Sequence, residues 1–445
     1  MLEKIIELVE TEDYKRLKLE ITNLNEADIA EIIEDIDDKE KQVKVFRLLP
    51  KDIAADTFAN LPLDIQQELI TLLSMKEAGS IIDNLDSDDA ADLIDEMPAN
   101  IVTKLLANTT PETRKDINYL LKYPVNSAGS IMNIDFFDLK ADLTIEEAIS
   151  KLRREGKEKE SIDTCFVLNK NRQLVGTIEL RELLFNPSDI KIEEIMDDRI
   201  IYTHTLEDQE EVAKQFSKYD LTLMPVVDRE ERLVGVITID DVIDVIEEET
   251  TEDIEKMAGI NPTDKPYMKT GIFETYKKRM PWLLILMFSA TFTGTIIQSY
   301  QDALATYVVL TAFIPMFMNT GGNAGNQTSV TVIRGISLNE IEFSDLFKIM
   351  WKEFRIAILA GVTLSAANFV KLLIVDRVSV PVAAVVSLTL IVTVTFAKIV
   401  GCMLPMCAKK IGLDPAVMAS PFITTIVDAI SLITYFNIAT FILGL

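Results

Sequence analysis

Five long apolar stretches occupy the C-terminal part of the sequence, near residues 281–300, 303–334, 353–374, 380–407 and 414–443. An α-helix crosses the roughly 30 Å hydrocarbon layer of a bilayer in about 20 residues, so each stretch is long enough to span it. Backbone polar groups inside that layer must be paired within the protein, which favours helices. We therefore predict five transmembrane α-helices, the second of them long and interrupted.

The basic residues around these stretches predict their orientation. Basic residues are few on one side of the spans: its two loops hold only Lys371 and Arg377, and the C-terminus holds none. The segments on the other side of the spans are rich in basic residues: Lys277, Lys278, Arg279, Arg334, Lys348, Lys352, Arg355, Lys409 and Lys410. Because cytoplasmic loops carry an excess of Lys and Arg, we expect a multi-pass protein of the cell (plasma) membrane with its N-terminus cytoplasmic and its C-terminus outside.

Formal charge divides the sequence into two unlike parts. The whole chain carries −27, but from Gly271 onward there are 12 Lys and Arg and 9 Asp and Glu, a net of +3. Residues 1–270 hold the other 32 basic and 62 acidic side chains, a net of −30. Such a surface repels nucleic acid and anionic lipid headgroups and attracts divalent cations. Plain solubility is the alternative interpretation.

Cysteine and histidine usage argues against several kinds of chemistry. Cys165, Cys402 and Cys407 have no metal-like spacing, and His204 is the single histidine, so disulfides, zinc sites and imidazole catalysis are disfavoured. No Ser/His/Asp set or phosphate-cradling glycine loop stands out, and we expect no enzyme. The first residues hold no apolar signal-peptide core, so we expect residues 1–270 in the cytosol.

A 12-residue repeat runs through the first segment. Helix-forming residues with apolar spacing lie between the repeated pairs, and Pro just inside a helix start is favourable because its missing N–H would be unpaired there. The pattern predicts a right-angled stack of short helices, a small solenoid. The repeated pairs are Leu49-Pro50, Leu61-Pro62, Leu73-Ser74, Leu85-Asp86, Met97-Pro98 and Thr109-Thr110.

A second repeat has a longer period. Phe166–Gly176 lines up with Pro225–Gly235, and each reads as a strand, a polar turn and a second strand. This doubled pattern resembles a tandem pair of CBS domains over roughly residues 130–246. The resemblance implies an α/β regulatory module of a kind that often binds adenosine nucleotides such as ATP. The candidate nucleotide contacts are Arg181, Glu182, Thr238 and Asp241.

The two copies differ at the nucleotide motif. The second copy has Thr238 and Asp241 in a Thr-x-x-Asp arrangement suited to ribose contacts, whereas the first has Glu179 and Glu182 at the matching places. After the second copy, a helix dense in acidic residues is expected from about Asp240 to Met257, leading to the first apolar stretch.

One carboxylate lies deep in the apolar stretches. Asp302, Asp376 and Asp414 lie near helix ends, whereas Asp428 lies midway along the last stretch. A carboxylate on a lipid-facing helix is costly, so such residues usually face a polar interior and mark ion paths. The alternative is an interhelical hydrogen bond or pairing with Lys398, although Lys398 lies close enough to a helix end to extend toward water.

A glycine- and amide-rich segment marks the second apolar stretch. Gly321-Gly-Asn-Ala-Gly-Asn-Gln327 has three glycines that permit close helix packing. Packing does not explain Asn323, Asn326 and Gln327 at the same depth, because amide groups there are tolerated where they line a wet cavity. We therefore assign this segment to an ion path.

The charge type of these candidates favours a divalent cation. Mg²⁺ prefers octahedral oxygen ligands and is often held by one or two carboxylates with several waters retained. One Asp per chain offers too little for a selective site, but a two-fold homodimer would bring two Asp428 side chains together on its axis. The residues alone do not decide among Mg²⁺, Ca²⁺, Mn²⁺ and Co²⁺.

The full set of motifs resembles the MgtE family of magnesium transporters. The motifs are Lys278-Arg-Met-Pro-Trp282, Pro315 through Gln327, and Gly412-Leu-Asp-Pro-Ala416 with Asp428. The resemblance implies a homodimeric Mg²⁺ channel closed by intracellular Mg²⁺, with a pore site of Asp428, Asn326, Gln327, Asn323, Ser420 and Asp414. It also implies sensor residues that bind Mg²⁺ between the cytosolic parts: Asp89, Asp92, Glu210, Asp220, Asp241, Asp244, Glu249, Glu252 and Asp253.

The expected fold class is a multidomain membrane protein with an all-α helical stack, an α/β CBS pair, a connecting helix and five membrane helices. We place the boundaries at 1–129, 130–195, 196–246, 247–275 and 276–445. A rival interpretation is a nucleotide-sensing module joined to a proton- or sodium-coupled transporter. Such a transporter should place more than one ionisable group near mid-membrane, where this sequence has essentially one.

Overall fold

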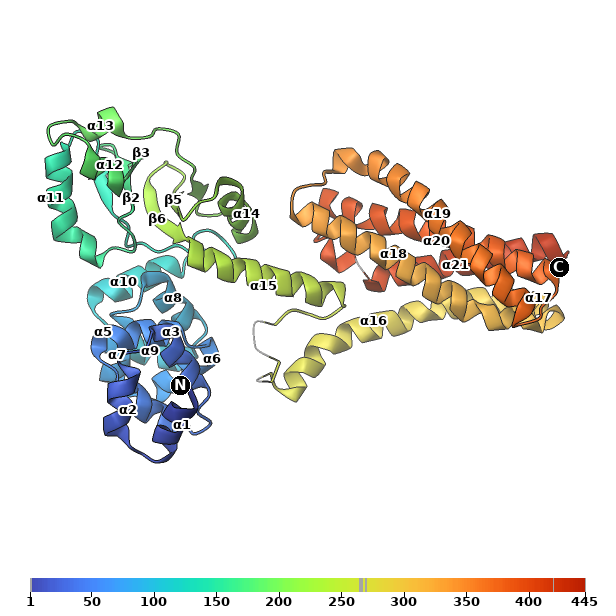
Figure 1. The fold of residues 1–445 in the computed structure, drawn as a ribbon, viewed down its shortest axis with the longest axis horizontal. Coiled ribbons are helices and arrows are strands. Elements are labelled where there is room, and N and C mark those ends of the chain that lie inside the picture. Colours follow the sequence, from blue (N-terminus) through green and yellow to red (C-terminus); the bar gives the residue numbers. More distant parts are fainter. Residues whose placement is uncertain (1, 264–266, 269, 419, 445) are drawn as a thin grey trace. The chain divides into compact units, whose positions relative to one another are not determined.

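The computed structural model describes residues 2–263, 267–268, 270–418 and 420–444. The chain divides into two compact units, one ending at Ile246 and the other beginning at Glu247. Figure 1 labels the helices and strands of both units.

The first unit begins with a stack of short helices around one apolar core. Buried side chains from successive helices, such as Leu17, Ile33, Phe58 and Ile82, form this continuous core. The helices are α1 (Leu2–Glu10), α2 (Tyr14–Ile21), α3 (Glu26–Glu34), α4 (Lys39–Phe46), α5 (Lys51–Ala59), α6 (Leu63–Leu72), α7 (Met75–Ile82), α8 (Ser87–Asp95), α9 (Ala99–Asn108) and α10 (Pro111–Leu120).

The 12-residue repeat marks the start of each of the last six helices of the stack. The second residue of every repeated pair is the N-cap: Pro50, Pro62, Ser74, Asp86, Pro98 and Thr110. The predicted stack is confirmed, but the expectation that Pro lies just inside each helix is wrong. The prolines precede the first helical residue because an N-cap needs extended backbone, which the fixed φ of Pro supplies.

Two copies of an α/β repeat follow the stack. In the first, β1 (Asp138–Lys140) pairs parallel with β2 (Thr164–Leu168), which pairs antiparallel with β3 (Leu174–Glu179). In the second, β4 (Thr203–His204), β5 (Leu223–Val227) and β6 (Leu233–Thr238) pair in the same way. The helices are α11 (Ile145–Glu155), α12 (Leu180–Phe185), α13 (Ile192–Ile195) and α14 (Gln209–Tyr219). The sequence repeat is therefore a structural repeat.

The acidic connecting helix, α15, runs from Ile239 to Met257, which matches the range expected from the sequence. Its first residues pack on the second α/β copy through the buried Val242 and Val245. The boundary between the two units falls within this helix. One continuous helix therefore carries residues of both units.

The second unit is a bundle of long helices (Figure 1). Among the described residues, four helical segments are long and apolar enough to cross a membrane: Ile272–Ser299, Phe343–Ile374, Val380–Lys410 and Ala416–Leu443. They contain α16 (Ile272–Ser299), α19 (Leu346–Ile374), α20 (Val380–Lys410) and α21 (Ser420–Leu443).

The fifth predicted span is a broken segment. It begins with α17 (Gln301–Thr306) and a 3₁₀ turn over Val308–Phe313, and continues as α18 (Ile314–Ser337). This confirms the predicted interruption, which falls just before Pro315. Helix α18 packs against α20 and α21, and its glycines and amides keep it less apolar than its four neighbours.

The glycines of α18 permit the close packing expected for them. A Cβ added at Gly321 would lie 2.8 Å from a methyl of Val427, and one at Gly325 would lie 2.7 Å from a methyl of Ile423, both on α21. A Cβ at Gly401 of α20 would overlap the Gly325 carbonyl. The backbones of α18 and α20 therefore meet where neither helix has a side chain.

Candidate metal sites

Asp428 lies in the first half of α21 and faces a cavity of about 440 Å³. Residues of α16, α18 and α21 line this cavity, and Thr293, Thr424 and Thr425 provide hydroxyl groups beside the carboxylate. The Oδ1 atom of Asp428 is buried and has no hydrogen-bond partner among the described residues. Because burying an unpaired carboxylate is costly, the arrangement suits a cation held from the cavity.

The amides of α18 do not line this cavity. Asn319, Asn323 and Gln327 recur at intervals of four residues and are exposed in the single chain, and Asn323 donates a hydrogen bond to Asn319 at 3.0 Å. Asn326 is partly buried with a buried Oδ1 atom. The structure thus places the predicted pore amides on α18 but not around Asp428 within one chain.

Asp414 has a different environment from the one predicted. Its carboxylate lies 2.7 Å from the ammonium of Lys256, which also pairs with Glu252 one turn earlier on α15. Asp414 also accepts the backbone N–H of Ala416 at 2.7 Å. Burial opposes the charged form of Lys256, but its two carboxylate partners outweigh burial and raise its pKa. Asp414 and Glu252, predicted as pore and sensor ligands respectively, therefore share one lysine.

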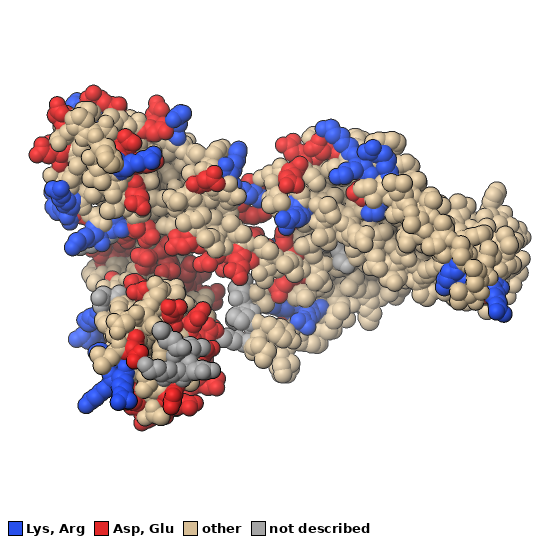
Figure 2. All heavy atoms as spheres, viewed as in Figure 1, with Lys and Arg blue, Asp and Glu red and all other residues tan. Residues whose placement is uncertain are grey.

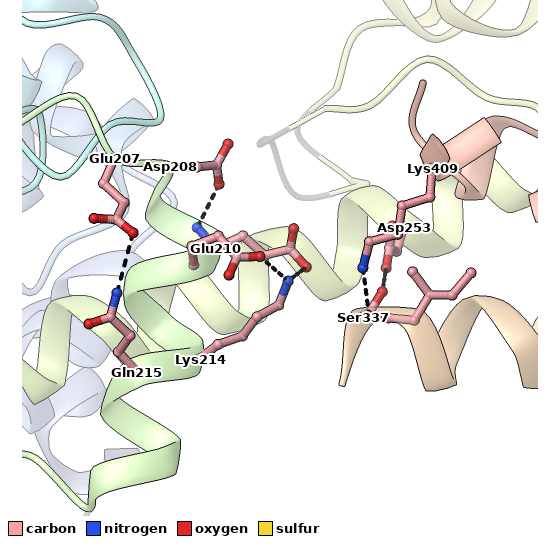
Figure 3. A network of polar contacts seen from close by, with 10 residues as sticks. Glu207, Asp208, Glu210, Lys214, Gln215, Asp253, Ser337 and Lys409 are labelled. Carbon is pink, nitrogen blue, oxygen red and sulfur yellow. Dashed lines mark hydrogen bonds and ion pairs between the residues drawn. The ribbon is translucent and has the colours of Figure 1, made fainter. Parts of the chain in front are cut away.

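Ser420 and Asp253 were also predicted as metal ligands. The side chain of Ser420 lies outside the described residues. Asp253 of α15 accepts a hydrogen bond from Ser337 at 3.5 Å, and Lys409 donates to the nearby Ile336 carbonyl at 3.4 Å (Figure 3). The first contact joins the end of the connecting helix to the end of α18, and the second joins the end of α18 to the end of α20.

An acidic cluster lies in the first unit, where α8 meets α15 (Figure 2). Asp88 is only 7% exposed, and Asn133 donates to its carboxylate at 3.3 Å and to Glu160 at 2.9 Å. Burial, with the nearby Asp86 and Asp241, raises the pKa of Asp89 to about 7 and that of Glu160 to about 7. These carboxyls repel one another and favour either protons or a bound cation.

The cluster contains part of the predicted sensor. Asp89 and Asp241 interact electrostatically within it, and burial raises the pKa of Asp241 to about 6. The charge of Asp244 on α15 also raises the pKa of Asp89. Asp92 lies on α8 with Asp89 and is exposed. Sequence reasoning missed Asp88 and Glu160. Asp88 adjoins Asp89 in the sequence, but Glu160 is 71 residues away and carries no local signal.

Other predicted sensor residues lie apart from this cluster. Glu210 pairs with Lys214 at 2.9 Å on α14 (Figure 3). Asp220 ends the same helix with a left-handed backbone, φ 52°, and is exposed. Glu249 is half-buried on α15. Among the described residues, no three Asp, Glu, His or Cys side chains are arranged to hold a metal ion.

The predicted nucleotide contacts are engaged within the chain. Asp241 accepts hydrogen bonds from the hydroxyl and backbone N–H of Thr238. In the first copy, Arg181 pairs with Glu179 at 2.6 Å and lies 3.8 Å from Glu182. The Thr-x-x-Asp motif is therefore an internal hydrogen-bonded turn.

A second charged site in the membrane unit was not predicted. The ammonium of Lys398 lies 3.4 Å from Glu353 and 3.1 Å from the hydroxyl of Thr328, which donates to Glu353 at 2.9 Å. The two charged side chains are only 9% and 13% exposed. The expectation that Lys398 extends toward water is wrong, because Glu353 and Thr328 satisfy it inside the bundle. The alternative pairing of Lys398 with Asp428 is also not observed.

Comparison with known proteins identifies the family. Family models match residues 24–126 (MgtE intracellular N domain), 128–189 and 192–248 (CBS domain), and 314–438 (MgtE, divalent cation transporter). The magnesium transporter MgtE of Thermus thermophilus is 34% identical over 337 residues, covering 75% of this chain and 74% of the relative. That of Bacillus subtilis is 34% identical over 335 residues, with the same coverage. The chain belongs to the MgtE family of magnesium transporters.

Membership in the MgtE family confirms the predicted resemblance, the fold class and the CBS pair. MgtE proteins are membrane transporters of Mg²⁺ and not enzymes. The matched family model is that of a divalent cation transporter, and the four long apolar helices fit a protein that spans a lipid bilayer. The domain boundaries given above stay a prediction.

Solved structures match the first unit. The soluble part of a magnesium transporter is 26% identical with a TM-score of 0.52, covering 56% of this chain and 97% of that one. The cytosolic domain of the Mg²⁺ channel MgtE in complex with ATP is 31% identical with a TM-score of 0.53, covering 55% of this chain and 100% of that one.

Proposed function

We propose that this MgtE chain forms a homodimeric Mg²⁺ channel whose pore lies on the two-fold axis and contains Asp428 from each copy. The observation that carries the proposal is the buried oxygen of Asp428, which has no hydrogen-bond partner in the part of the chain that the structure describes and faces a cavity partly lined by threonines. Two carboxylates hold a hydrated Mg²⁺ through its water shell, which the ion sheds reluctantly. Asn323, Asn326, Gln327, Ser420 and Asp414 are proposed as further polar groups along the path.

The exposed amides of α18 support a second copy. Asn319, Asn323 and Gln327 form a polar stripe on a helix of the membrane unit. Lipid does not satisfy amide groups, so such a stripe needs protein or water beside it. A copy related by two-fold symmetry would cover the stripe and double the single carboxylate.

We propose that intracellular Mg²⁺ closes the pore by binding the acidic residues of the first unit and the connecting helix. The mutual repulsion of Asp88, Asp89, Glu160 and Asp241 supports this role, because a divalent cation removes it. No preformed three-ligand site exists among the described residues, so the ion would draw acidic pairs together. The candidate pairs are Asp89 or Asp92 with Asp241, and Asp220 with Asp244. Glu210, Glu249, Glu252 and Asp253 are further candidates.

The contacts at the end of α15 give this gate a route to the membrane helices. Lys256 joins Glu252 to Asp414 before α21, and Asp253 meets Ser337 at the end of α18. The connecting helix therefore contacts the end of α18 and the segment just before α21, next to the two helices that carry the proposed pore residues. A few sites with coupling of about 1–3 kcal/mol each suffice to bias such a gate.

We also propose where the protein is located and that it binds a nucleotide. The excess of basic residues on one side of the spans supports a cell-membrane protein with its N-terminus in the cytoplasm. ATP binding at the CBS pair, through Arg181, Glu182, Thr238 and Asp241, is supported by the relative's complex with ATP. Nucleotide binding would require Thr238 and Asp241 to exchange their internal hydrogen bonds.

Mg²⁺ flux into liposomes tests the pore assignment. Asp428→Asn should reduce Mg²⁺ uptake at least about tenfold, since the amide removes the charge that attracts the ion. The matched control is Asp302→Asn, an exposed carboxylate on α17, which should transport like the unaltered chain. Uptake by Asp428→Asn at the control rate would refute the pore assignment. Uptake that requires a proton gradient would favour coupled transport instead.

Inhibition of flux by Mg²⁺ on the cytoplasmic side tests the gate. Replacing Glu249, Glu252 and Asp253 with the matching amides should leave uptake active at Mg²⁺ concentrations that close the unaltered channel, because the ion loses its ligands on α15. The exposed acids Asp28 and Glu31 of α3, changed in the same way, provide the control. Inhibition that persists unchanged in the α15 variant would remove this helix from the sensor.

A further inference from the structure

A cavity of about 690 Å³ lies in the first unit, where the last helix of the stack meets both α/β copies. Its walls come from α10, from the residues before β1, and from the turns of the β2–β3 and β5–β6 hairpins. This volume is in the range of small-molecule sites. None of Arg181, Glu182, Thr238 and Asp241, the predicted nucleotide contacts, lines it.

The cavity is basic in a strongly acidic part of the chain. Residues 1–270 carry a net charge of −30, yet five cationic and two acidic side chains line this cavity, a net of +3. Among the described residues, none of the five cations is in an ion pair. The two acidic residues, Asp116 and Asp228, offset only part of this charge, and the remaining excess of positive charge favours a bound anion. The cations are Lys115, Lys122, Lys170, Arg172 and Arg232.

The two arginines are held on fixed turns. Asn169 closes the first turn by accepting the backbone N–H groups of Asn171 at 2.8 Å and Gln173 at 3.0 Å. Asp228 closes the second by accepting those of Glu230 and Arg232, both at 2.9 Å. These side-chain bonds fix the backbone of both turns that carry the arginines.

The two hairpins are also joined to each other. A β-bridge pairs Gln173 with Arg232, and Gln173 donates from its side chain to the Glu230 carbonyl at 3.0 Å. The guanidinium groups of Arg172 and Arg232 therefore extend from a shared, hydrogen-bonded base. Guanidinium groups suit the paired oxygens of phosphate.

The rest of the cavity wall is apolar and aromatic. Tyr119 of α10, Phe136, Ile134 and Leu233 contribute to it, and the Lys122 ammonium lies 6.0 Å from the centre of the Tyr119 ring. A wall of this kind accommodates a flat ring next to the charged groups. A small inorganic anion would leave this surface uncovered.

We propose that this cavity binds a small organic polyphosphate, such as a nucleoside triphosphate. The phosphates contact Arg172, Arg232 and the lysines, and the ring lies against Tyr119 and Phe136. The ligand bridges α10 to both hairpins and so ties the helical stack to the α/β pair. This site is separate from the Mg²⁺ pore and from the predicted CBS nucleotide contacts.

Calorimetric binding to the full-length protein in detergent, without Mg²⁺, tests the proposal with ATP and with inorganic triphosphate. Arg172→Asn/Arg232→Gln should weaken ATP binding about tenfold or more. Asn is chosen at position 172 because it tolerates the local left-handed backbone, φ 63°. Lys44→Gln/Lys104→Gln, which removes two exposed charges from the helical stack, should bind like the unaltered chain.

Three outcomes would overturn the proposal. Equal weakening in the Lys44/Lys104 control would show a diffuse charge effect instead of a site. ATP binding that is lost in Arg181→Gln but kept in Arg172→Asn/Arg232→Gln would assign the ligand to the predicted CBS contacts. Inorganic triphosphate binding as tightly as ATP would remove the role given to Tyr119 and Phe136.

Discussion

Single charged residues in the membrane unit have sharply different environments. Asp428 has a buried oxygen without a partner among the described residues, whereas Glu353 and Lys398 neutralise each other beside Thr328. The membrane unit therefore holds three deep ionisable groups where the sequence indicated one, so their number does not separate a channel from a coupled transporter. Because Glu353 and Lys398 are paired, we assign them a structural role and leave the ion to Asp428.

A double-mutant cycle on this pair tests the structural role. Glu353→Gln should destabilise the membrane unit by about 3–5 kcal/mol, because it leaves the Lys398 ammonium buried without a counter-charge. Lys398→Met should lower the stability by a similar amount, because it leaves the Glu353 carboxylate buried without a counter-charge. The double variant, which buries no charge at either position, should regain most of the lost stability. Thermal unfolding in detergent measures the three variants. Additive losses in the double variant would show that the two side chains act independently.

At the scale of elements, glycines decide how closely the helices around the proposed pore pack. The meeting of Gly325 and Gly401 leaves no room for a side chain between α18 and α20. This contact lies beside the amides of α18 in the sequence, so it fixes the position of the backbone that carries them. Gly294 of α16, by contrast, has no neighbour within 4 Å of an added Cβ.

An alanine pair tests this packing. Gly401→Ala should lower the free energy of unfolding by about 1–3 kcal/mol, since its Cβ forces α20 away from the Gly325 carbonyl. Gly294→Ala is the matched control and should leave stability unchanged or raise it by up to about 1 kcal/mol, because Ala favours a helix over Gly. Both are measured by thermal unfolding in the same detergent. A Gly401→Ala protein as stable as the control would contradict the packing described here.

At the scale of the whole molecule, the acidic cluster that we propose as a Mg²⁺ sensor should also respond to pH. The pKa values of Asp89 and Glu160 are raised to about 7, and that of Asp241 to about 6. Between the ordinary carboxyl range and pH 7 the folded chain therefore holds more protons than the unfolded one. Its stability then falls as pH rises through this window, and above it the repulsion is complete unless Mg²⁺ is bound.

Proton release on Mg²⁺ binding measures this linkage. Addition of Mg²⁺ to the full-length protein at pH 7 should release about one proton per chain, because two of these carboxyls are then half protonated. Release should be close to zero at pH 9. Asp89→Asn/Glu160→Gln should abolish most of it, and the exposed pair Asp28→Asn/Glu31→Gln should not. Equal release at both pH values would exclude the cluster as the Mg²⁺ site.

The elements of the fold were largely predictable because their signals are local. The 12-residue repeat predicted the helical stack, the doubled strand-turn-strand pattern predicted the α/β pair, and apolar stretches predicted the membrane helices. The N-caps at Pro50, Pro62 and Pro98 differ from the prediction by one position. That detail depends on backbone angles at the helix start.

The candidate sites were only partly predictable, because proximity depends on contacts between distant segments. Asp428 could be singled out from its apolar neighbours in the sequence. Glu160 could not be assigned to the Asp88 cluster, nor Glu353 to Lys398, since 72 and 45 residues separate these partners in the sequence. Glu210, predicted for the sensor, is paired with Lys214.

The sequence by itself determined the architecture, the acidic and apolar parts and the carboxylate deep in the membrane segment, since these follow from composition and periodicity along the chain. Tertiary structure alone decided which charges are neutralised, because neutralisation requires atoms within a few ångströms of each other. Lys256 joins Glu252 to Asp414 and Lys398 joins Thr328 to Glu353, whereas an oxygen of Asp428 stays unpaired among the described residues. Those contacts separate a structural charge from one available to an ion.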